Sequence, residues 1–298
     1  MYDVVVVGSG PAGLSAALYL KRAGKNVLII EKEYEGTGQL AGSICVENYL
    51  GIPSVRGDLL GEKFRQHVID AQVPFLEEEV AEIFCEDEWR LLFVSGEKVA
   101  AKAVLYATGA VPKKLGIPEE ENYQGRGISY CAYCDGSLYK KKDVAVVGGG
   151  DTALDDAFYL SGICRKVYLI HRRKEFRGMA STIEKIKKRS NVEIMRETQV
   201  QHVRGQNKIE EIQLDRGADR KVSGLFIAIG SRPETDMIKT YVERDFAGYV
   251  VAGEDCRTKT PGLFVAGDIR AKKLRQVITA VSDGANAAAS AVDFLNNR

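Results

Sequence analysis

Residues Val4–Glu31 read VVVVGSGPAGLSAALYLKRAGKNVLIIE, and this stretch decides the fold. Four valines predict a buried strand, and the glycines at Gly8, Gly10 and Gly13 predict a tight turn. An Ala- and Leu-rich segment then predicts a helix that ends at Gly24, before a second apolar strand. Strand, glycine turn, helix and strand in this order form the βαβ unit of a dinucleotide-binding fold.

The same pattern returns at Val144–His171, which reads VAVVGGGDTALDDAFYLSGICRKVYLIH. In both copies the same number of residues separates the first glycine from the last residue of the second strand. A weaker echo relates YATGAVP at 106–112 to IAIGSRP at 227–233, and each would close its own module. An internal repeat of this length predicts two Rossmann-like modules.

The C-terminal part contains another strand that ends in glycine, TPGLFVAGD at 260–268, and an Ala-rich helix from about residue 276. Neither has a counterpart inside the second module, so we assign both to the first. The predicted fold class is therefore α/β, with two three-layer dinucleotide-binding domains, one inserted into the other. The expected domains are 1–113 with 245–298, and 114–244.

Two chain crossings, near residues 112–117 and 241–247, then connect the domains and permit a hinge. Short stretches of mixed polarity are expected to add antiparallel strands to the modules, at 77–82, 92–99, 192–200 and 209–214.

The first glycine turn carries what a dinucleotide pyrophosphate needs. Glycines let the backbone approach the phosphates, and the helix start at Pro11-Ala12 offers unpaired N–H groups and a positive dipole end. Glu31 ends the second strand and is placed to accept a hydrogen bond from a ribose hydroxyl, which implies an adenosine without a 2′-phosphate. The alternative is a glycine turn that only packs the helix on the strand.

The second copy departs at this specificity position, where His171 replaces the acid and Arg172, Arg173 and Arg177 follow. A cluster of cations binds a 2′-phosphate through charge-assisted hydrogen bonds, whereas an acid repels it. The expected ligand is NADP(H), and the alternative is a solvated basic run. The residues expected to serve its pyrophosphate are Gly148, Gly150 and Ala153. Two nucleotide sites in one chain favour a flavin and a nicotinamide that exchange electrons.

A cysteine pair, CAYCDG at 131–136, lies shortly before the second glycine turn. Cys131 and Cys134 have the CxxC spacing that closes a small redox-active disulfide and favours one thiolate. Asp135 is placed to pass a proton to the thiolate that leaves. The alternative is half of a zinc site, but the sequence has no second CxxC and no histidine nearby, so we expect no metal.

Composition excludes several classes of protein. The 298 residues are 45% hydrophobic and 28% charged, which excludes collagen-like and disordered chains. A net charge of +1 gives no general attraction to nucleic acid or to anionic membranes. The sequence contains no uninterrupted apolar run long enough to predict a membrane span. Six cysteines in a chain of this size indicate a reducing compartment, so we expect a cytoplasmic protein.

These motifs together resemble the low-molecular-weight, NADPH-dependent thioredoxin reductases, a class of flavin-dependent pyridine nucleotide-disulfide oxidoreductases. The resemblance covers nearly the whole chain. Beyond the turns and the cysteine pair, its landmarks are GQL at 38–40, VEN at 46–48, ATG at 107–109, HRRKEFR at 171–177, GD at 267–268 and RQV at 275–277.

The resemblance implies FAD in the first domain and NADPH in the second. Glu31 would hold the adenosine ribose, Gln39 and Asn48 would lie near the flavin, and Asp268 would bind the ribityl-phosphate region. Arg275, Gln276 and Val277 would line the isoalloxazine ring. The other residues implied for FAD are Gly8, Ser9, Gly10, Pro11, Ala12, Gly13, Lys32, Thr108, Gly109 and Gly267, with Val80 as a backbone contact to adenine. Those implied for NADPH are Gly148, Gly149, Gly150, Asp151, Thr152, His171, Arg172, Arg173 and Arg177.

The resemblance also implies the reaction: electrons pass from NADPH through FAD and the cysteine pair to thioredoxin or a thioredoxin-like protein. Cys134 would face the flavin, Cys131 would attack the partner disulfide and Asp135 would act as acid and base. The family implies a homodimer whose second domain rotates between two orientations. Alternatives are a reductase with another donor, such as ferredoxin or a deazaflavin, or another protein partner, and a nucleotide-binding redox sensor without turnover.

Two features bear on the partner. Tyr133 stands between the cysteines where the family has a smaller residue, often threonine, and could alter the fit of the partner protein. The stretch Gly125-Arg126-Gly127 resembles a partner-docking segment, and an exposed turn is the alternative.

Overall fold

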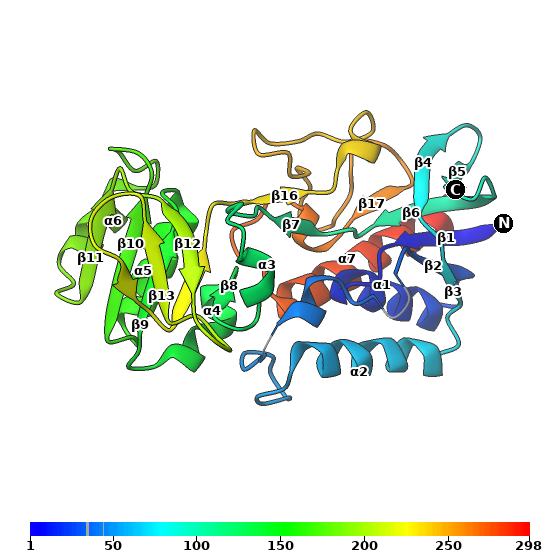
Figure 1. Cartoon of the computed structure of the whole chain (residues 1–298). Helices are drawn as coiled ribbons and strands as arrows, with labels where there is room; N and C mark the ends of the chain where they lie inside the picture. Colours follow the sequence, from blue (N-terminus) through cyan, green and yellow to red (C-terminus); the bar gives the residue numbers. More distant parts are fainter. Residues whose placement is uncertain (34–35, 44) are drawn as a thin grey trace. The chain divides into compact units, whose positions relative to one another are not determined.

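The computed structural model describes residues 1–33, 36–43 and 45–298. It divides into two compact units. The first contains residues 1–42, 49–111 and 232–298, and the second contains 43–48 and 112–231. Both units are α/β structures with a central parallel sheet (Figure 1), which confirms the expected fold class of two Rossmann-like domains.

The sheet of the first unit has the strand order β3-β2-β1-β6-β5-β4, and β17 pairs with β6. Strands β1, β2, β3, β6 and β17 are parallel, whereas β4 and β5 run antiparallel. Alternate residues of β1 face opposite layers, as expected for a strand covered on both sides. The bounds are β1 Tyr2–Val7, β2 Val27–Glu31, β3 Phe75–Glu77, β4 Val80–Cys85, β5 Trp89–Phe93, β6 Lys98–Tyr106 and β17 Leu263–Val265.

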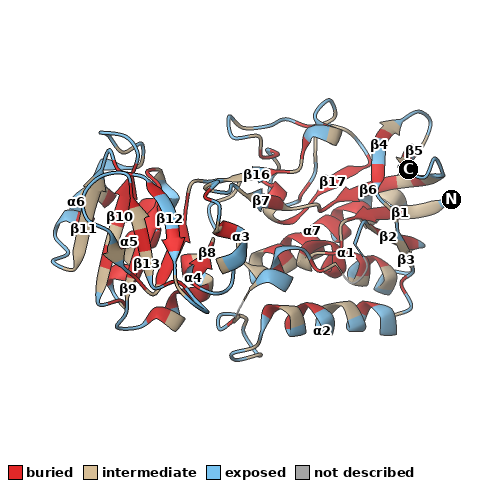
Figure 2. Ribbon diagram, viewed as in Figure 1, coloured by how far each residue is buried: buried red, intermediate tan, exposed pale blue. Residues whose placement is uncertain are grey.

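Two long helices cover one face of this sheet, and the buried residues of that layer are red in Figure 2. Helix α7 packs on helix α1 at Gly284, where an added Cβ would lie 2.2 Å from the carbonyl oxygen of Ala12. The Ser15 hydroxyl donates to the carbonyl of Val281 across the same contact, at 2.8 Å. The helical segments of this unit are α1 Pro11–Arg22, η1 Gly38–Gly42, α2 Gly57–Asp70, η3 Asp236–Ile238, η4 Gly267–Ile269 and α7 Val277–Asn296.

The second unit repeats this plan with the strand order β11-β10-β9-β15-β8, all parallel. Helices α5 and α6 contribute to the core on one face of the sheet, and a separate antiparallel sheet of β12, β13 and β14 covers the other. Its strands are β8 Ile128–Ser129, β9 Asp143–Val147, β10 Lys166–His171, β11 Val192–Arg196, β12 Val200–Arg204, β13 Glu211–Leu214, β14 Arg220–Lys221 and β15 Gly224–Ile227. Its helices are α3 Glu120–Tyr123, α4 Ala132–Asp135, η2 Gly136–Tyr139, α5 Asp151–Ser161 and α6 Ala180–Lys187.

The weaker sequence echo has a clear structural meaning. Strands β6 and β15 lie beside the first strand of each repeat and end level with it, Tyr106 opposite Val7 and Ile227 opposite Val147. The closing strand of each module therefore reaches the glycine turn. The C-terminal strand β17 and helix α7 belong to the first unit, as expected.

Two expectations about boundaries are wrong. The segment 192–200 is not an antiparallel strand, because β11 within it pairs parallel to β10. The second crossing lies at 231–232, not near 241–247, because η3 and its neighbours pack in the first unit, where Ile238 and Val242 join the core. The connecting strands β7 (Ala110–Pro112) and β16 (Ser231–Pro233) pair with each other. Within the described residues, no helix is long and apolar enough to cross a membrane.

Replacing Gly284 by alanine should destabilise the first unit by about 1–3 kcal/mol, because the new Cβ forces α7 away from α1. The gain in helix propensity offsets about 1 kcal/mol of the clash. Chemical denaturation followed by circular dichroism measures the difference. Ser282→Ala, at an exposed position of the same helix, is the control. Equal stability of the two variants would contradict the assignment of Gly284 to a close helix contact.

Candidate functional site

The first glycine turn connects β1 to α1 and is shaped by close backbone approach. Gly8 has φ +100°, and an added Cβ there would lie 2.6 Å from the carbonyl oxygen of Ala107. An added Cβ on Gly13 would lie 1.9 Å from the carbonyl oxygen of Gly8. At Gly10, by contrast, an added Cβ meets no atom of the described residues within 4 Å. The first and third glycines are therefore needed for packing, while the second faces open space.

This open space lies at the start of α1, where Gly10 is the N-cap and Pro11 the first helical residue. Glycine has no side chain to cap the helix, so the first backbone N–H groups are available to a ligand. Their partial positive charge suits a pyrophosphate.

Glu31 lies at the end of β2 and contacts the turn directly. Its Oε2 accepts from the backbone N–H of Ser9 at 2.8 Å and from the Ser9 hydroxyl at 2.9 Å. Its Oε1 accepts from the backbone N–H of Lys32 at 2.9 Å. The carboxylate therefore braces the glycine turn, a contact that the sequence analysis did not anticipate.

The segment η4 and the start of α7 contribute further site residues in the first unit. Asp268 has a buried Oδ1 with no hydrogen-bond partner among the described residues. Burial raises the pKa of this carboxyl. The ammonium of Lys272 lies 3.7 Å from that oxygen and 2.9 Å from Oδ2 of Asp283. Oδ2 of Asp283 also accepts from the backbone N–H of Gly267 at 3.0 Å, so it anchors the turn that presents Asp268.

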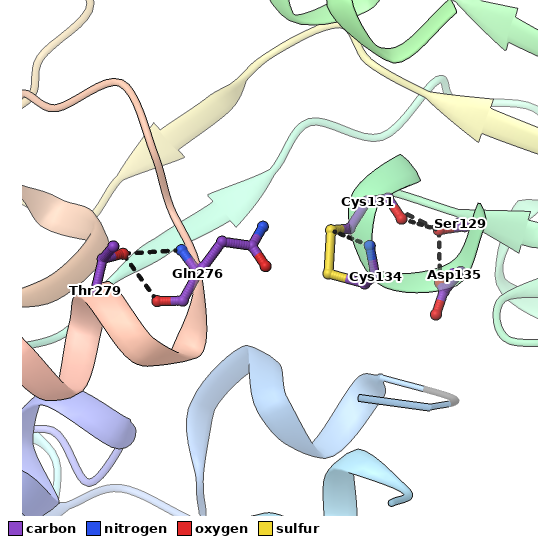
Figure 3. The surroundings of a disulfide bond; sticks show 6 residues. All are labelled: Ser129, Cys131, Cys134, Asp135, Gln276 and Thr279. Carbon is purple, nitrogen blue, oxygen red and sulfur yellow. Dashed lines mark hydrogen bonds between the residues drawn. A yellow bond between two sulfur atoms is a disulfide. The ribbon is translucent and has the colours of Figure 1, made fainter. Parts of the chain in front are cut away.

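The next residues along the chain are also held in place. The Arg275 guanidinium stacks over the Tyr249 ring, 3.9 Å from its centroid, and donates to the carbonyl of Asp268 at 3.4 Å. Gln276 and Thr279 form a capping box that starts α7 at Val277 (Figure 3).

The other residues expected around FAD have structural contacts of their own. The Gln39 amide donates to the carbonyl of Ala110 at 2.5 Å, and the Thr108 hydroxyl donates to the carbonyl of Glu234 at 3.1 Å. Gly109 has φ +72° and Val80 is buried in β4. Asn48 departs from expectation in one respect, because segment 43–48 groups with the second unit.

The first unit fits a bound dinucleotide. An open cradle at Gly10 and an uncapped helix start suit the pyrophosphate. The buried Oδ1 of Asp268, which has no hydrogen-bond partner among the described residues, is the kind of group that a ligand hydroxyl satisfies. These residues fit FAD, the cofactor expected in this unit.

In the second glycine turn the first glycine again packs closely, while the glycine at the helix start faces open space. An added Cβ on Gly148 would lie 2.3 Å from the carbonyl oxygen of Ala228, whereas at Gly150 it meets nothing within 4 Å. Gly150 is the N-cap of α5, again without a side-chain cap. Asp151 and Thr152 begin the helix, and Asp151 Oδ1 accepts from the backbone N–H of Met179 at 2.7 Å. This contact holds the segment after β10 against the start of α5.

His171 does not join the basic cluster as an available cation. Its ring is buried beneath the turn, where an added Cβ on Gly149 would lie 2.1 Å from it, and it stacks on Phe176. Its Nε2 lies 3.0 Å from the carbonyl of Glu175. Burial lowers the pKa of His171, as do the nearby arginines. The ring therefore packs under the turn as a neutral group.

The arginines of this segment are exposed and have no hydrogen-bond or ion-pair partner for their side chains in the described part of the chain. The backbone N–H of Arg177 donates to the carbonyl of Gly149 at 2.7 Å, which keeps the cluster at the turn. The cluster consists of Arg172, Arg173 and Arg177.

The cysteine pair forms a disulfide at the start of the short helix α4. The Cys131 sulfur accepts from the backbone N–H of Cys134 at 3.1 Å (Figure 3). Ser129, at the end of β8, joins the pair to the acid: its hydroxyl accepts from the Cys131 N–H at 3.1 Å and donates to Asp135 Oδ2 at 2.6 Å.

Asp135 itself is buried, and its Oδ1 has no hydrogen-bond partner among the described residues. Burial raises the pKa of this carboxyl, and the hydrogen bond from Ser129 lowers it in part. A carboxyl held closer to its protonated form beside a disulfide suits proton transfer to a leaving thiolate.

A buried carboxylate on α3 fixes the residue before the pair. Glu120 accepts from the backbone N–H groups of Leu115 and Gly116 at 2.8 and 2.7 Å and from the Tyr130 hydroxyl at 2.7 Å. Burial, and then this contact, raise the pKa of Tyr130. The start of the second unit and the cysteine segment are therefore tied to one side chain.

The sequence analysis missed Ser129, Glu120 and Asp283. Ser129 could have been suspected, because a hydroxyl two residues before a CxxC pair on a strand end lies near the following acid. Glu120 and Asp283 stand among other charged or small residues, and no sequence signal marks them as buried.

A disulfide that shares a chain with two dinucleotide cradles and a buried acid is characteristic of oxidoreductases that pass electrons between nucleotides and thiols. Comparison with known proteins agrees. A model of the family described as pyridine nucleotide-disulphide oxidoreductase matches residues 2–284. A thioredoxin reductase of Mycoplasma genitalium is 40% identical over 297 residues, 96% of this chain and 93% of the relative. One of Listeria innocua is 36% identical over 301 residues, 99% of this chain and 94% of the relative.

Solved structures show the same relationship. A thioredoxin reductase from Streptococcus pyogenes superposes with a TM-score of 0.93 at 35% identity, over 100% of this chain and 99% of the other. One from Giardia duodenalis gives 0.91 at 30% identity, over 99% of each chain. The chain belongs to the low-molecular-weight thioredoxin reductase family of pyridine nucleotide-disulphide oxidoreductases. It is a flavoprotein disulfide reductase with a CxxC disulfide, in a family that uses FAD and NAD(P)H.

Replacing Gly10 by alanine should keep the fold and lower flavin content at least about 10-fold, because the methyl group occupies the space where the backbone meets the pyrophosphate. Gly13→Ala should instead destabilise the flavin-free protein, since its Cβ overlaps the carbonyl of Gly8. Flavin released per chain and thermal unfolding of the apoprotein separate the two effects. Full flavin content in a folded Gly10→Ala variant would exclude this turn as the flavin cradle.

Proposed function

We propose that this protein is an NADPH-dependent thioredoxin reductase that acts as a homodimer in the cytoplasm. FAD would be held in the first unit by the turn Gly8–Gly13, by Glu31 and by Asp268. NADPH would be held in the second unit by the turn Gly148–Thr152 and the arginine cluster. The observation that carries the proposal is the Cys131–Cys134 disulfide with the buried acid Asp135 beside it.

The arginine cluster supports NADPH as the donor. Three exposed guanidinium groups that lack a partner in the described part of the chain lie on a segment bonded to the glycine turn. They are therefore available to a 2′-phosphate without breaking an ion pair that the structure describes. At the matching position of the first unit, Glu31 would repel such a phosphate.

The disulfide supports the chemistry of a reductase. When bound, FAD would supply the transfer of an electron pair from the nicotinamide to the disulfide. The Cys131–Cys134 bond then breaks on taking two electrons, and Asp135 delivers one proton to the Cys134 sulfur. The thiolate remains on Cys131, where the N–H of Cys134 stabilises it.

The second half of the reaction passes these electrons to the partner. The Cys131 thiolate attacks one sulfur of the partner disulfide, which forms a mixed disulfide and releases the other partner sulfur as a thiolate. Asp135 takes the proton back from Cys134, whose thiolate attacks Cys131. The Cys131–Cys134 bond reforms, and the partner leaves with both sulfurs reduced. The relatives named as thioredoxin reductases support a thioredoxin-like partner.

Anaerobic titration tests the donor. NADPH should bleach the flavin far faster than NADH, with uptake of about two electron pairs as flavin and disulfide both fill. Replacing Arg172, Arg173 and Arg177 by alanine should raise the KM for NADPH about 100-fold and leave that for NADH unchanged, because three charge-assisted contacts to the 2′-phosphate are lost. A flavin that stays oxidised with NADPH and bleaches with another reductant would contradict the assignment of NADPH as the electron donor.

A matched control removes the same charge elsewhere in the unit, by Lys185→Ala, Lys187→Ala and Lys188→Ala. This triple variant should keep the preference for NADPH. An equal loss of that preference in both triple variants would show a general charge effect in place of a phosphate site.

Ser129→Ala should extend disulfide reduction to higher pH. Burial raises the pKa of Asp135 and the Ser129 hydrogen bond lowers it, so removing the hydroxyl raises the pKa further. An acid donates its proton only below its pKa. The pH at which the rate begins to fall should therefore be higher in this variant. Asp135→Asn should lower the rate about 10²–10⁴-fold. Stopped-flow thiol formation between pH 5 and 9 measures both, with Ser137→Ala, at an exposed position in η2, as control. An unmoved profile in Ser129→Ala would disprove the role of Asp135 as the proton donor.

A further inference from the structure

The residue between the two cysteines belongs to an aromatic pair within the second unit. Tyr133, between the two cysteines, is 46% exposed. Its ring stacks on that of Tyr159 from α5, with centroids 4.5 Å apart and planes inclined by 25°. Gly136 allows this arrangement, because an added Cβ there would lie 3.0 Å from the Tyr159 ring. The Tyr133 ring is therefore fixed against α5, while part of it stays open to solvent.

The helix that carries Tyr159 also carries an exposed acid. Asp155, on α5 one turn before Tyr159, is exposed and has no hydrogen-bond or ion-pair partner among the residues that the structure describes. Burial raises the pKa of the Tyr133 hydroxyl, and the carboxylates of Asp155 and Asp156 raise it further.

We infer that Tyr133, Tyr159 and Asp155 form a partner-contact surface that selects protein disulfides bordered by an apolar side chain and a positive charge. The inference rests on the proposed function, in which Cys131 attacks a protein disulfide. Thiolate attack brings two sulfurs into bonding contact, so the surface around the partner disulfide must meet the residue between the cysteines.

The surface has the physical properties of a binding hot spot. An exposed tyrosine contributes large contact area, and only a few interface residues, often tyrosines, carry most of the binding energy. Stacking on Tyr159 fixes the Tyr133 ring before the partner arrives, so little conformational entropy is lost on docking. The Asp155 carboxylate, which has no partner among the described residues, attracts a cation and repels an acidic partner surface.

The test compares reduction of a purified thioredoxin with reduction of the small disulfide 5,5′-dithiobis(2-nitrobenzoate), both by the holoenzyme with NADPH. In Tyr133→Thr, the ratio of kcat/KM for thioredoxin to kcat/KM for the small disulfide should fall about 5- to 50-fold. Tyr159→Ala should lower the same ratio by a smaller factor, because the Tyr133 ring keeps its contact area and loses only its stacking partner. Tyr19→Thr, at another exposed tyrosine, is the control and should leave the ratio unchanged.

Asp155→Asn tests the charge. It should reduce kcat/KM for thioredoxin at low salt and flatten its dependence on ionic strength, with Glu243→Gln as an exposed control. An unchanged ratio in Tyr133→Thr overturns the inference. The inference is also overturned if Tyr133→Thr changes the Cys131–Cys134 redox potential, measured against glutathione, and leaves the ratio unchanged. That result would give Tyr133 a purely structural role.

Failure of the proposed function has a different signature. If the wild-type enzyme reduces the small disulfide with NADPH and reduces no thioredoxin, the proposed partner is wrong whatever the variants do. If the wild type reduces thioredoxin and Tyr133→Thr has the wild-type ratio, the proposed function stands and only the contact surface falls.

Discussion

The structure depends on one steric constraint that occurs twice: the backbone between the first strand and the first helix passes against the end of the closing strand. Gly8 meets the carbonyl of Ala107, and Gly148 meets that of Ala228, at distances that no side chain tolerates. This approach sets where each helix begins, after the carboxyl end of the first strand, and no side chain of the described residues caps the start of either helix. Both glycine turns, proposed above to hold the nucleotides, follow from the same contact.

Much of this could be predicted from the sequence, because glycine spacing and apolar runs report local backbone geometry. The two βαβ units, the return of β17 and α7 to the first unit, and the cysteine segment all follow from such local patterns. The parallel pairing of β11 and the crossing at 231–232 could not be predicted, because tertiary packing decides both. Burial of Glu120 and Asp283 likewise depends on how the chain packs around them, although Glu120 accepts from backbone N–H groups only four and five residues before it.

The specificity position shows how repeated units diverge. Glu31 and His171 occupy the same place after the second strand, and each packs against its own glycine turn: the carboxylate through the Ser9 N–H, the imidazole by filling the space beneath Gly149. Because the His171 ring packs beneath the turn, the positive charge at this position comes from the arginines that follow it. The sequence analysis treated His171 as one of the cations, whereas the structure assigns it to the support of the turn and leaves Arg172, Arg173 and Arg177 exposed.

Glu120 has a mechanical consequence. One carboxylate holds two N–H groups at Leu115 and Gly116, just beyond the point where the chain enters the second unit, and also the hydroxyl of the residue before Cys131. Glu120 is itself buried, so losing one of these partners would leave a buried carboxylate oxygen without its hydrogen bond, which is costly. The residue before the disulfide therefore cannot move away from Leu115 and Gly116 without that cost.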